Sequence, residues 1–493
     1  MLNHSRLKKI KEFIGKVNKS EDLREFYINS FWSLLGSAIS KGLLFVAWLM
    51  VAKILGKEGN GEVGIVRSTI NVFVIFVGSG IALTTTKFIP ELLEKNKERV
   101  GKIISLTLTV STLIGFFLSL LLFLGSSFIA NNILSAPDLL VTLQISSFLL
   151  FLSALSSLLS GCLRGFKDFK SLMVINFFYG ISLLGFLYYG TIKYGVEGTF
   201  AGFTFSTLIL VILGIFYLRK NLARNAIVLS FKFKGEYPIL RHFTLPAILT
   251  GVMVMPFKWG VDTIMVNYQN GFKELGLFTA LILFQNLVMM VTTTLDAPLI
   301  TIMVKEKINK KIERLNLIIP WAIGVFMVLP IFFFPNIYGI LLGEEYMEDA
   351  NYKGTLFIIL VTTTIMLYKQ GIARIMIVNN LMWLSFLSNL IWGLLLLSVF
   401  YCTKIKNAES MAFAYFIAYV VNTVIIIPLY VKRKIIPLSL IKSKLSILIW
   451  IIFSILVATL YKFDINNVAI RVLGLILFFF VFAILFYNLL LKD

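Results

Sequence analysis

The sequence predicts an all-α membrane protein with about fourteen transmembrane helices, and three observations lead to that fold class. Apolar residues make up 58% of the 493 residues, and charged residues only 14%. The apolar residues fall in long blocks, three of which (103–124, 315–334 and 472–491) contain no charge. Basic residues gather between alternate blocks. A block of roughly 20 apolar residues crosses a bilayer, and it does so as a helix because lipid offers the backbone no hydrogen-bond partners.

Fourteen such blocks follow one another along the chain. The expected spans are 28–54, 63–86, 102–124, 139–163, 171–192, 199–218, 243–267, 275–303, 315–335, 352–373, 377–401, 411–431, 445–461 and 469–491. The connections between them are too short to form a soluble catalytic domain. No phosphate-binding glycine loop followed by Lys-Ser or Lys-Thr occurs, so the chain is not expected to hydrolyse ATP itself.

The basic residues indicate how the chain is oriented. When the loops are assigned alternately to two sides, one side receives 33 Lys and Arg residues and the other only 7. Because basic residues beside spans stay cytoplasmic, this imbalance predicts a multi-pass protein of the cell (plasma or inner) membrane with both termini cytoplasmic. The same alternation argues against nucleic-acid binding, despite a formal net charge of +21. The two cysteines and two histidines lack ligand-type neighbours, so we expect no disulfide framework, no metal and no cofactor.

An internal repeat divides the chain into two halves. The segment 62–65 recurs as 274–277, and Gly161-x-x-Arg164 recurs as Gly371-x-x-Arg374 at almost the same offset. Six spans therefore repeat as six spans in the same orientation, which predicts two lobes related by a pseudo-twofold axis along the membrane normal, with the substrate site between them near the midplane. The expected units are a basic amphipathic N-terminus (1–27), an N-lobe (28–218), an interlobe linker (219–242), a C-lobe (243–431), a basic loop (432–444) and two further helices (445–491).

Charged residues inside the spans are candidate site residues, because burying a charge in a bilayer costs about 2.5–3.5 kcal/mol on insertion scales. Lys41 lies halfway through the first span and Arg67 lies in the second. Lys258 and Asp262 are four residues apart in the seventh span and so share one helix face. We assign these four to the substrate cavity. Three further charges are assigned to a cavity rim or gate: Asp296, Lys369 and Arg374.

Each of these residues also has a purely structural explanation. Lys41 would snorkel to the interface or pair with a carbonyl group, and Arg67 would reach water at the outer interface. Lys258 and Asp262 would neutralise each other as a structural pair. The three rim charges would simply lie at the cytoplasmic surface.

The seventh span also carries a predicted hinge, made of Pro246, Pro256 and Gly260. Proline removes a helix hydrogen bond and bends the helix, and a bent helix at a lobe interface suits a rocking motion. The alternative is a static bend. The acidic segment 344–349 is expected to be a solvated external loop.

Three stretches of the sequence carry a family resemblance: Ala52 to Gly64, Gly78 to Glu91, and Leu163-Arg164-Gly165-Phe166-Lys167-Asp168-Phe169. They resemble the corresponding stretches of polysaccharide flippases of the multidrug/oligosaccharidyl-lipid/polysaccharide (MOP) exporter superfamily. The resemblance implies a flippase that moves a polyprenyl phosphate- or pyrophosphate-linked oligosaccharide from the cytoplasmic to the outer leaflet by alternating access. In the related lipid-linked peptidoglycan-precursor flippases, spans one and two carry functional arginines, and Lys41 and Arg67 occupy similar spans.

Two other functions compete with this one. A multidrug or small-solute antiporter on the same fold would need an intramembrane carboxylate, and the predicted N-lobe spans contain none. A membrane enzyme such as a glycan ligase or polymerase would need acidic catalytic residues and a large external loop. We therefore expect a transporter and not an enzyme. Its expected partners are the lipid-linked oligosaccharide, the bilayer, and glycosyltransferases or a polymerase of the same pathway, and we expect a monomer.

Overall fold

The structure is a computed structural model that describes residues 21–77, 79–245, 248, 252–293, 299, 303, 310–379, 381–433, 443–463 and 467–491. Helices dominate these residues, and no strand occurs among them. Eleven helices within the described residues are long and apolar enough to cross a membrane. The all-α membrane fold class is therefore confirmed, while the number of fourteen spans and the symmetry of the lobes stay predictions.

The N-terminal half consists of five long helices, and two of them are too long for one bilayer crossing. The helices are α2 (Glu21–Val77), α3 (Ser79–Leu92), α4 (Lys97–Phe128), α5 (Leu140–Gly165) and α6 (Phe169–Arg224), with the short elements η1 (Ile129–Ile133) and η2 (Pro137–Leu139) between α4 and α5. The 57 residues of α2 are interrupted at Gly56, where φ is +67°, and the 56 residues of α6 at Tyr194 and Gly195. Both interruptions fall where the sequence predicts a turn between spans.

The two parts of α6 fold back on each other. The hydroxyl groups of Thr191 and Thr199 lie 2.9 Å apart. A Cβ atom on Gly190 would come within 2.2 Å of the carbonyl oxygen of Gly198, so the backbones touch directly at this point. Small residues permit such close approach of membrane helices. The predicted fifth and sixth spans are thus the two arms of one helical hairpin.

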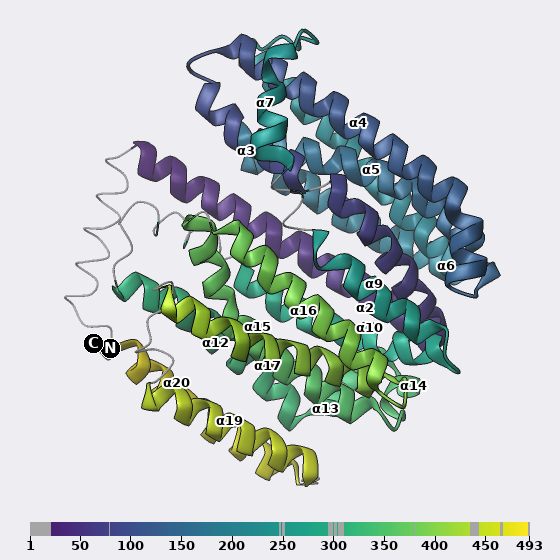
Figure 1. Ribbon diagram of the computed structural model, residues 1–493, viewed down its shortest axis with the longest axis vertical. Helices are drawn as coiled ribbons and strands as arrows, with labels where there is room; N and C mark the ends of the chain where they lie inside the picture. The colour runs from purple at the N-terminus through teal and green to yellow at the C-terminus, as the bar shows by residue number, and fades with distance from the viewer. Residues whose placement is uncertain are drawn as a thin grey trace.

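The C-terminal half contains the remaining helices. They are α9 (Met255–Val266), α10 (Gly271–Thr293), α12 (Lys310–Phe333), α13 (Pro335–Leu342), α14 (Glu344–Met347), α15 (Tyr352–Val378), α16 (Met382–Cys402), α17 (Ala408–Lys432), α19 (Lys444–Lys462) and α20 (Val468–Leu491). In Figure 1 the helices α3 to α6 form one group and α10 to α17 another, and α2 lies between the two groups. The helices α19 and α20 lie at the flank of the second group.

The last two helices are held by aromatic packing on α12. The indole of Trp321 is 1% exposed, stacks on Trp450 of α19 with ring centroids 5.3 Å apart, and meets the ring edge of Phe486 of α20 at 5.0 Å. Aromatic pairs of this geometry contribute about 0.5–1.5 kcal/mol beyond the burial of their area.

The segment predicted to be the interlobe linker begins within the end of α6 and then packs on the start of α4. It contains η3 (Lys234–Glu236), α7 (Tyr237–Ile239) and η4 (Leu240–Thr244). Arg99 Nε donates to Glu236 Oε1 at 2.8 Å, and Gly101 leaves room for the carbonyl oxygen of Val228, which a Cβ atom would approach to 2.1 Å. The linker is therefore fixed to the N-terminal helices.

Candidate functional site

A cavity of about 300 Å³ lies between α2 and α10. Its lining from α2 is Lys41, Leu44, Phe45, Trp48 and Arg67, and its lining from α10 is Leu283, Asn286, Leu287, Met289, Met290 and Thr293. The first four residues follow the i, i+3, i+4, i+7 spacing of one helix face. Since α2 comes from the N-terminal half of the chain and α10 from the C-terminal half, the cavity lies between the two halves.

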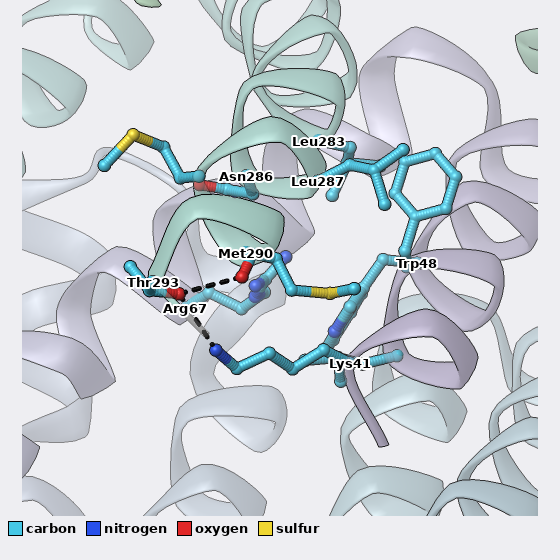
Figure 2. Close-up of a pocket in the computed structure, with 11 residues that line it drawn as sticks. Lys41, Trp48, Arg67, Leu283, Asn286, Leu287, Met290 and Thr293 are labelled. Carbon is cyan, nitrogen blue, oxygen red and sulfur yellow. Dashed lines mark hydrogen bonds between the residues drawn. The ribbon is translucent and has the colours of Figure 1, made fainter. Parts of the chain in front are cut away.

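Two cations of α2 meet in this cavity. Lys41 Nζ donates to Thr293 Oγ1 at 3.2 Å, and the guanidinium of Arg67 lies over the indole of Trp48, 3.9 Å from the ring centroid. Figure 2 shows the lysine and the arginine extending beside the α10 residues Met290 and Thr293. The break at Gly56 explains this meeting, because it divides α2 into two parts and lets the second part carry Arg67 back toward Lys41.

The cavity lining carries positive charge without an acid among its described residues. The helical part of α2 after Gly56 begins earlier than the predicted second span, so Glu58 and Glu62 lie inside it. The predicted absence of carboxylates from this span is therefore wrong for the longer helix that the structure shows. Neither glutamate lines the cavity, and Glu58 is exposed.

The predicted pair of Lys258 and Asp262 lies where α9 packs on α2. Ser68 Oγ donates to Asp262 Oδ2 at 2.5 Å, and Trp259 Nε1 donates to Thr69 Oγ1 at 3.0 Å. Among the described residues Asp262 is paired with this serine and not in a direct ion pair with Lys258. The charge of Lys258 is attracted by Asp262 and repelled by Arg67, the neighbour of Ser68. These two residues thus belong to the wall beside the cavity and not to its lining.

The structure separates the residues predicted for the rim. Lys369 of α15 lines a second cavity. Arg374 is 2% exposed and donates to Asn316 Oδ1 at 3.1 Å and to the carbonyl oxygen of Thr292 at 3.4 Å, so it joins α15 to α12 and α10. Asp296 lies outside the described residues. No contact brings Lys369 and Arg374 together in the part of the chain that the structure describes, and their role as a gate stays a prediction.

The predicted hinge is described only in part. Pro246 lies outside the described residues, and Pro256 lies in the first turn of α9, directly after a turn at Met253 and Val254. The predicted seventh span is therefore not one continuous helix. Proline suits the first turn because it has no N–H to leave unpaired there. A Cβ atom on Gly260 would lie 3.5 Å from the side chain of Leu397, an ordinary contact distance, so nothing requires glycine sterically at this point.

At the predicted outer end the two groups of helices are in direct contact. Gly61 of α2 and Gly276 of α10 cross so closely that a Cβ atom on Gly61 would lie 1.8 Å from the carbonyl oxygen of Phe272. Asn60 Nδ2 donates to the carbonyl oxygen of Gly276 at 2.8 Å. This crossing joins α2 to α10 beyond the cavity and closes the predicted outer end.

An ion pair reinforces the closure. Lys57 Nζ lies 2.6 Å from Asp349 Oδ2, and the hydroxyl of Tyr346 donates to the carbonyl oxygens of Ala52 and Gly56 at 2.9 and 2.8 Å. The expectation of a solvated loop at 344–349 is therefore wrong for Tyr346, which is 1% exposed, and for Asp349, which lies in the ion pair. The break of α2 leaves carbonyl groups without partners inside the helix. The hydroxyl of Tyr346 supplies a hydrogen bond to these buried groups.

The comparisons with known proteins agree with this architecture. The family model described as polysaccharide biosynthesis protein matches residues 27–301, more than half of the chain. No curated protein sequence matches the chain. Among solved structures, the lipid II flippase MurJ in an inward closed conformation is 17% identical, with a TM-score of 0.68 over 95% of this chain and 99% of that chain.

Two transporters of the MOP superfamily share the fold as well. An inward-facing multidrug resistance MATE family transporter is 14% identical, with a TM-score of 0.64 over 82% of this chain and 98% of that chain. A transporter from Pyrococcus furiosus Vc1 (DSM3638), whose binding pocket has a reverse polarity that suggests a different function, is also 14% identical, with a TM-score of 0.60 over 82% of this chain and 94% of that chain. The fold is that of a MOP-type transporter or flippase, a multi-pass membrane protein.

Proposed function

The chain belongs to the polysaccharide biosynthesis protein family, and on that basis we propose that it is a flippase for lipid-linked oligosaccharides. It binds a polyprenyl phosphate or pyrophosphate headgroup in the cavity between α2 and α10. It then releases the headgroup to the opposite leaflet when the closed outer end opens. The direction of transport runs from the cytoplasmic to the outer leaflet.

The state of Arg67 supports this proposal most directly. Its guanidinium is stacked on Trp48, and among the described residues it has neither an ion pair nor a hydrogen bond. A charge held inside a membrane protein without a partner is costly. Stacking uses the face of the guanidinium and leaves its N–H groups at the edge, which is the geometry that grips phosphate bidentately. An anionic headgroup would supply the missing partner.

Lys41 adds a second positive charge to the same cavity. Its ammonium group reaches Thr293 of α10, so the two charges approach the cavity from α2 while their polar neighbour lies on the facing helix. A phosphate bound between them would contact both helices. Since α2 and α10 meet in the closed outer end, binding at this place links the headgroup to the contacts that must separate during transport.

The alternative function is a multidrug or small-solute antiporter, and Asp262 is the observation that favours it. This carboxylate is 7% exposed and lies in the wall between the lobes, where a transported cation or proton would bind. It accepts from Ser68 and lies near the positive charge of Lys258, which weakens its attraction for a further cation. Ethidium efflux conferred on a sensitive host would favour the antiporter.

The test is translocation of a fluorescent polyprenyl-pyrophosphate sugar in proteoliposomes. Each charge-assisted contact that is lost removes about 1.5–3 kcal/mol, so we expect Lys41→Ala and Arg67→Ala each to slow translocation by about 10- to 100-fold. Lys41→Arg, which keeps the charge, retains most of the rate. The control is Lys220→Ala, which removes an exposed lysine at the end of α6. Rates like those of the unaltered protein in both cavity variants would refute the proposal.

A further inference from the structure

A second cavity, of about 260 Å³, lies among the helices of the C-terminal half. It is formed mainly by α15, α16 and α17, and Met289 of α10 lines both this cavity and the one that holds Lys41 and Arg67. The two cavities therefore adjoin along one side chain. Its polar and aromatic lining is Lys369, Gln370, Ser385, Ser388, Asn389, Trp392, Tyr419, Asn422 and Tyr430.

Lys369 is the only charged residue among the described lining residues, and most of its hydrogen-bonding capacity is unused. Its Nζ donates to Asn422 Oδ1 at 2.5 Å and lies 5.9 Å from the ring centroid of Tyr419. Asn422 is held in turn, because its Nδ2 donates to the carbonyl oxygen of Ser388 at 2.9 Å. An ammonium group has three N–H donors, so two of them are left for a ligand.

Trp392 contributes an aromatic ring and a further hydrogen-bond donor to the wall of this cavity. Its side chain is 5% exposed, and its indole Nε1 has no hydrogen-bond partner in the described part of the chain. The ring packs against Tyr419, with centroids 5.3 Å apart. Buried tryptophan N–H groups usually find an acceptor. An acceptor atom on a bound molecule would satisfy this donor.

We infer that this second cavity binds an acidic, carboxylate-bearing sugar unit of the transported glycan, an inference that rests on the proposed function. The lining offers both hydrogen-bond donors and acceptors, since serine hydroxyls and amide groups do both. Sugar hydroxyls also donate and accept, and the apolar C–H face of a pyranose packs on aromatic rings such as Trp392. The carboxylate of the sugar pairs with Lys369.

A second phosphate site fits the lining less well. A phosphate dianion only accepts hydrogen bonds, so it would use the donors of Ser385, Ser388 and Asn389 and leave their acceptor oxygens without a partner. Phosphate also has no apolar face for the aromatic rings. In addition, the adjoining cavity already presents the arginine and lysine that suit a phosphate. A sugar joined directly to that phosphate would extend toward Met289 and Lys369.

Binding is tested first, with free glucuronate, glucose and inorganic phosphate titrated against the purified full chain while tryptophan fluorescence is recorded. We expect glucuronate to cause a saturable fluorescence change in the unaltered protein and no such change in Trp392→Phe. Lys369→Gln should need at least about tenfold more glucuronate for the same change. Lys369→Arg should restore the response at the original concentration. Glucose and phosphate each require at least about tenfold higher concentrations. An unchanged response in Trp392→Phe or Lys369→Gln, or saturation by phosphate at the glucuronate concentration, would overturn the inference.

Transport separates this inference from the proposed function. Two fluorescent polyprenyl-pyrophosphate probes are compared in proteoliposomes, one carrying glucuronic acid and one carrying glucose. We expect Lys369→Gln to slow the glucuronyl probe by at least about tenfold and to leave the glucosyl probe unchanged, whereas Lys41→Ala slows both. If Lys369→Gln leaves both rates unchanged while Lys41→Ala slows both, the acidic-sugar site is refuted and the flippase stands. If Lys41→Ala slows neither probe, the proposed function itself fails. Size-exclusion elution of each variant confirms that it is folded.

Discussion

Replacement of Lys57 by methionine perturbs the closed end of the molecule, predicted to be the outer one, without touching either cavity. The ammonium group of Lys57 lies 2.6 Å from Asp349, and each side chain is 14% exposed. The methionine keeps the unbranched apolar stem and removes the charge. We expect the outer end to open more often, because the remaining carboxylate then lies partly buried in the closed state without its partner.

The magnitude follows from the burial of the pair. Breaking a fully buried ion pair by removing one partner costs about 3–5 kcal/mol, whereas an exposed pair contributes about 0–1 kcal/mol. A pair with 14% exposure on both sides lies between these limits, at about 1.5–3 kcal/mol. The ratio of closed to open molecules should therefore fall by about 10- to 100-fold.

The chain offers a control in the exposed pair of Lys273 and Glu58, which joins α10 to α2 at 3.6 Å with side chains 50% and 64% exposed. Lys273→Met should change the ratio by less than about fivefold. The double variant Lys57→Met/Asp349→Asn should lose less free energy of closure than the sum of the losses in the two single variants, because the two side chains interact directly.

Spin labels report the opening. Exposed lysines at the predicted outer end, Lys193 in the N-terminal half and Lys404 in the C-terminal half, are replaced by cysteine after Cys162 and Cys402 have been removed. Distances between the labels are measured by double electron–electron resonance in lipid nanodiscs. Short distances in the starting protein and a larger long-distance fraction in Lys57→Met are expected. If the distances between the labels are distributed equally in Lys57→Met and Lys273→Met, the prediction is wrong.

Three further predictions concern the helix crossing, the buried arginine and the buried acid. Gly61→Ala should prevent closure, because its Cβ atom would lie 1.8 Å from the carbonyl oxygen of Phe272, and the same labelled pair should show mainly long distances. Arg374→Met should lower the thermal unfolding midpoint in detergent, since about 1.5–3 kcal/mol of hydrogen bonding to Asn316 and its neighbours is lost. It should leave translocation intact at low temperature. A transport defect in the folded variant would instead support a role of Arg374 as a gate. Asp262→Asn keeps a hydrogen-bond acceptor and should leave lipid translocation unchanged. If the substitution abolishes translocation, the carboxylate binds a coupling ion.

Much of the fold follows from local features of the sequence. The predicted spans 28–54 and 63–86 leave a connection between them, and Gly56, where α2 breaks, lies in that connection. The face that lines the first cavity is also visible in the sequence, because Trp48 lies two turns after Lys41. Lys41 and Arg67, the charged residues of the first two predicted spans, line one cavity, as expected for charges that must face protein or water, while their role in substrate binding stays a prediction.

Contacts between distant segments carry no such signal. Nothing in the acidic composition of 344–349 distinguishes Asp349, which pairs with Lys57, from its solvated neighbours. The repeat that includes Gly276 hints at a shared motif, but it does not reveal that this residue crosses α2 at Gly61. Arg374 is similar, because only the fold shows that it is used in hydrogen bonds between helices.

Recognition of a phosphate headgroup by the cavity between α2 and α10 is the step on which the proposed transport depends. The most direct measurement compares two fluorescent probes in proteoliposomes that hold the unaltered protein. Both probes carry the same sugar and the same polyprenyl chain, but one is joined by pyrophosphate and the other by an uncharged ether. We predict that the pyrophosphate probe crosses at least about 100-fold faster, since two charge-assisted contacts are made only with it. Equal rates for the two probes would contradict it.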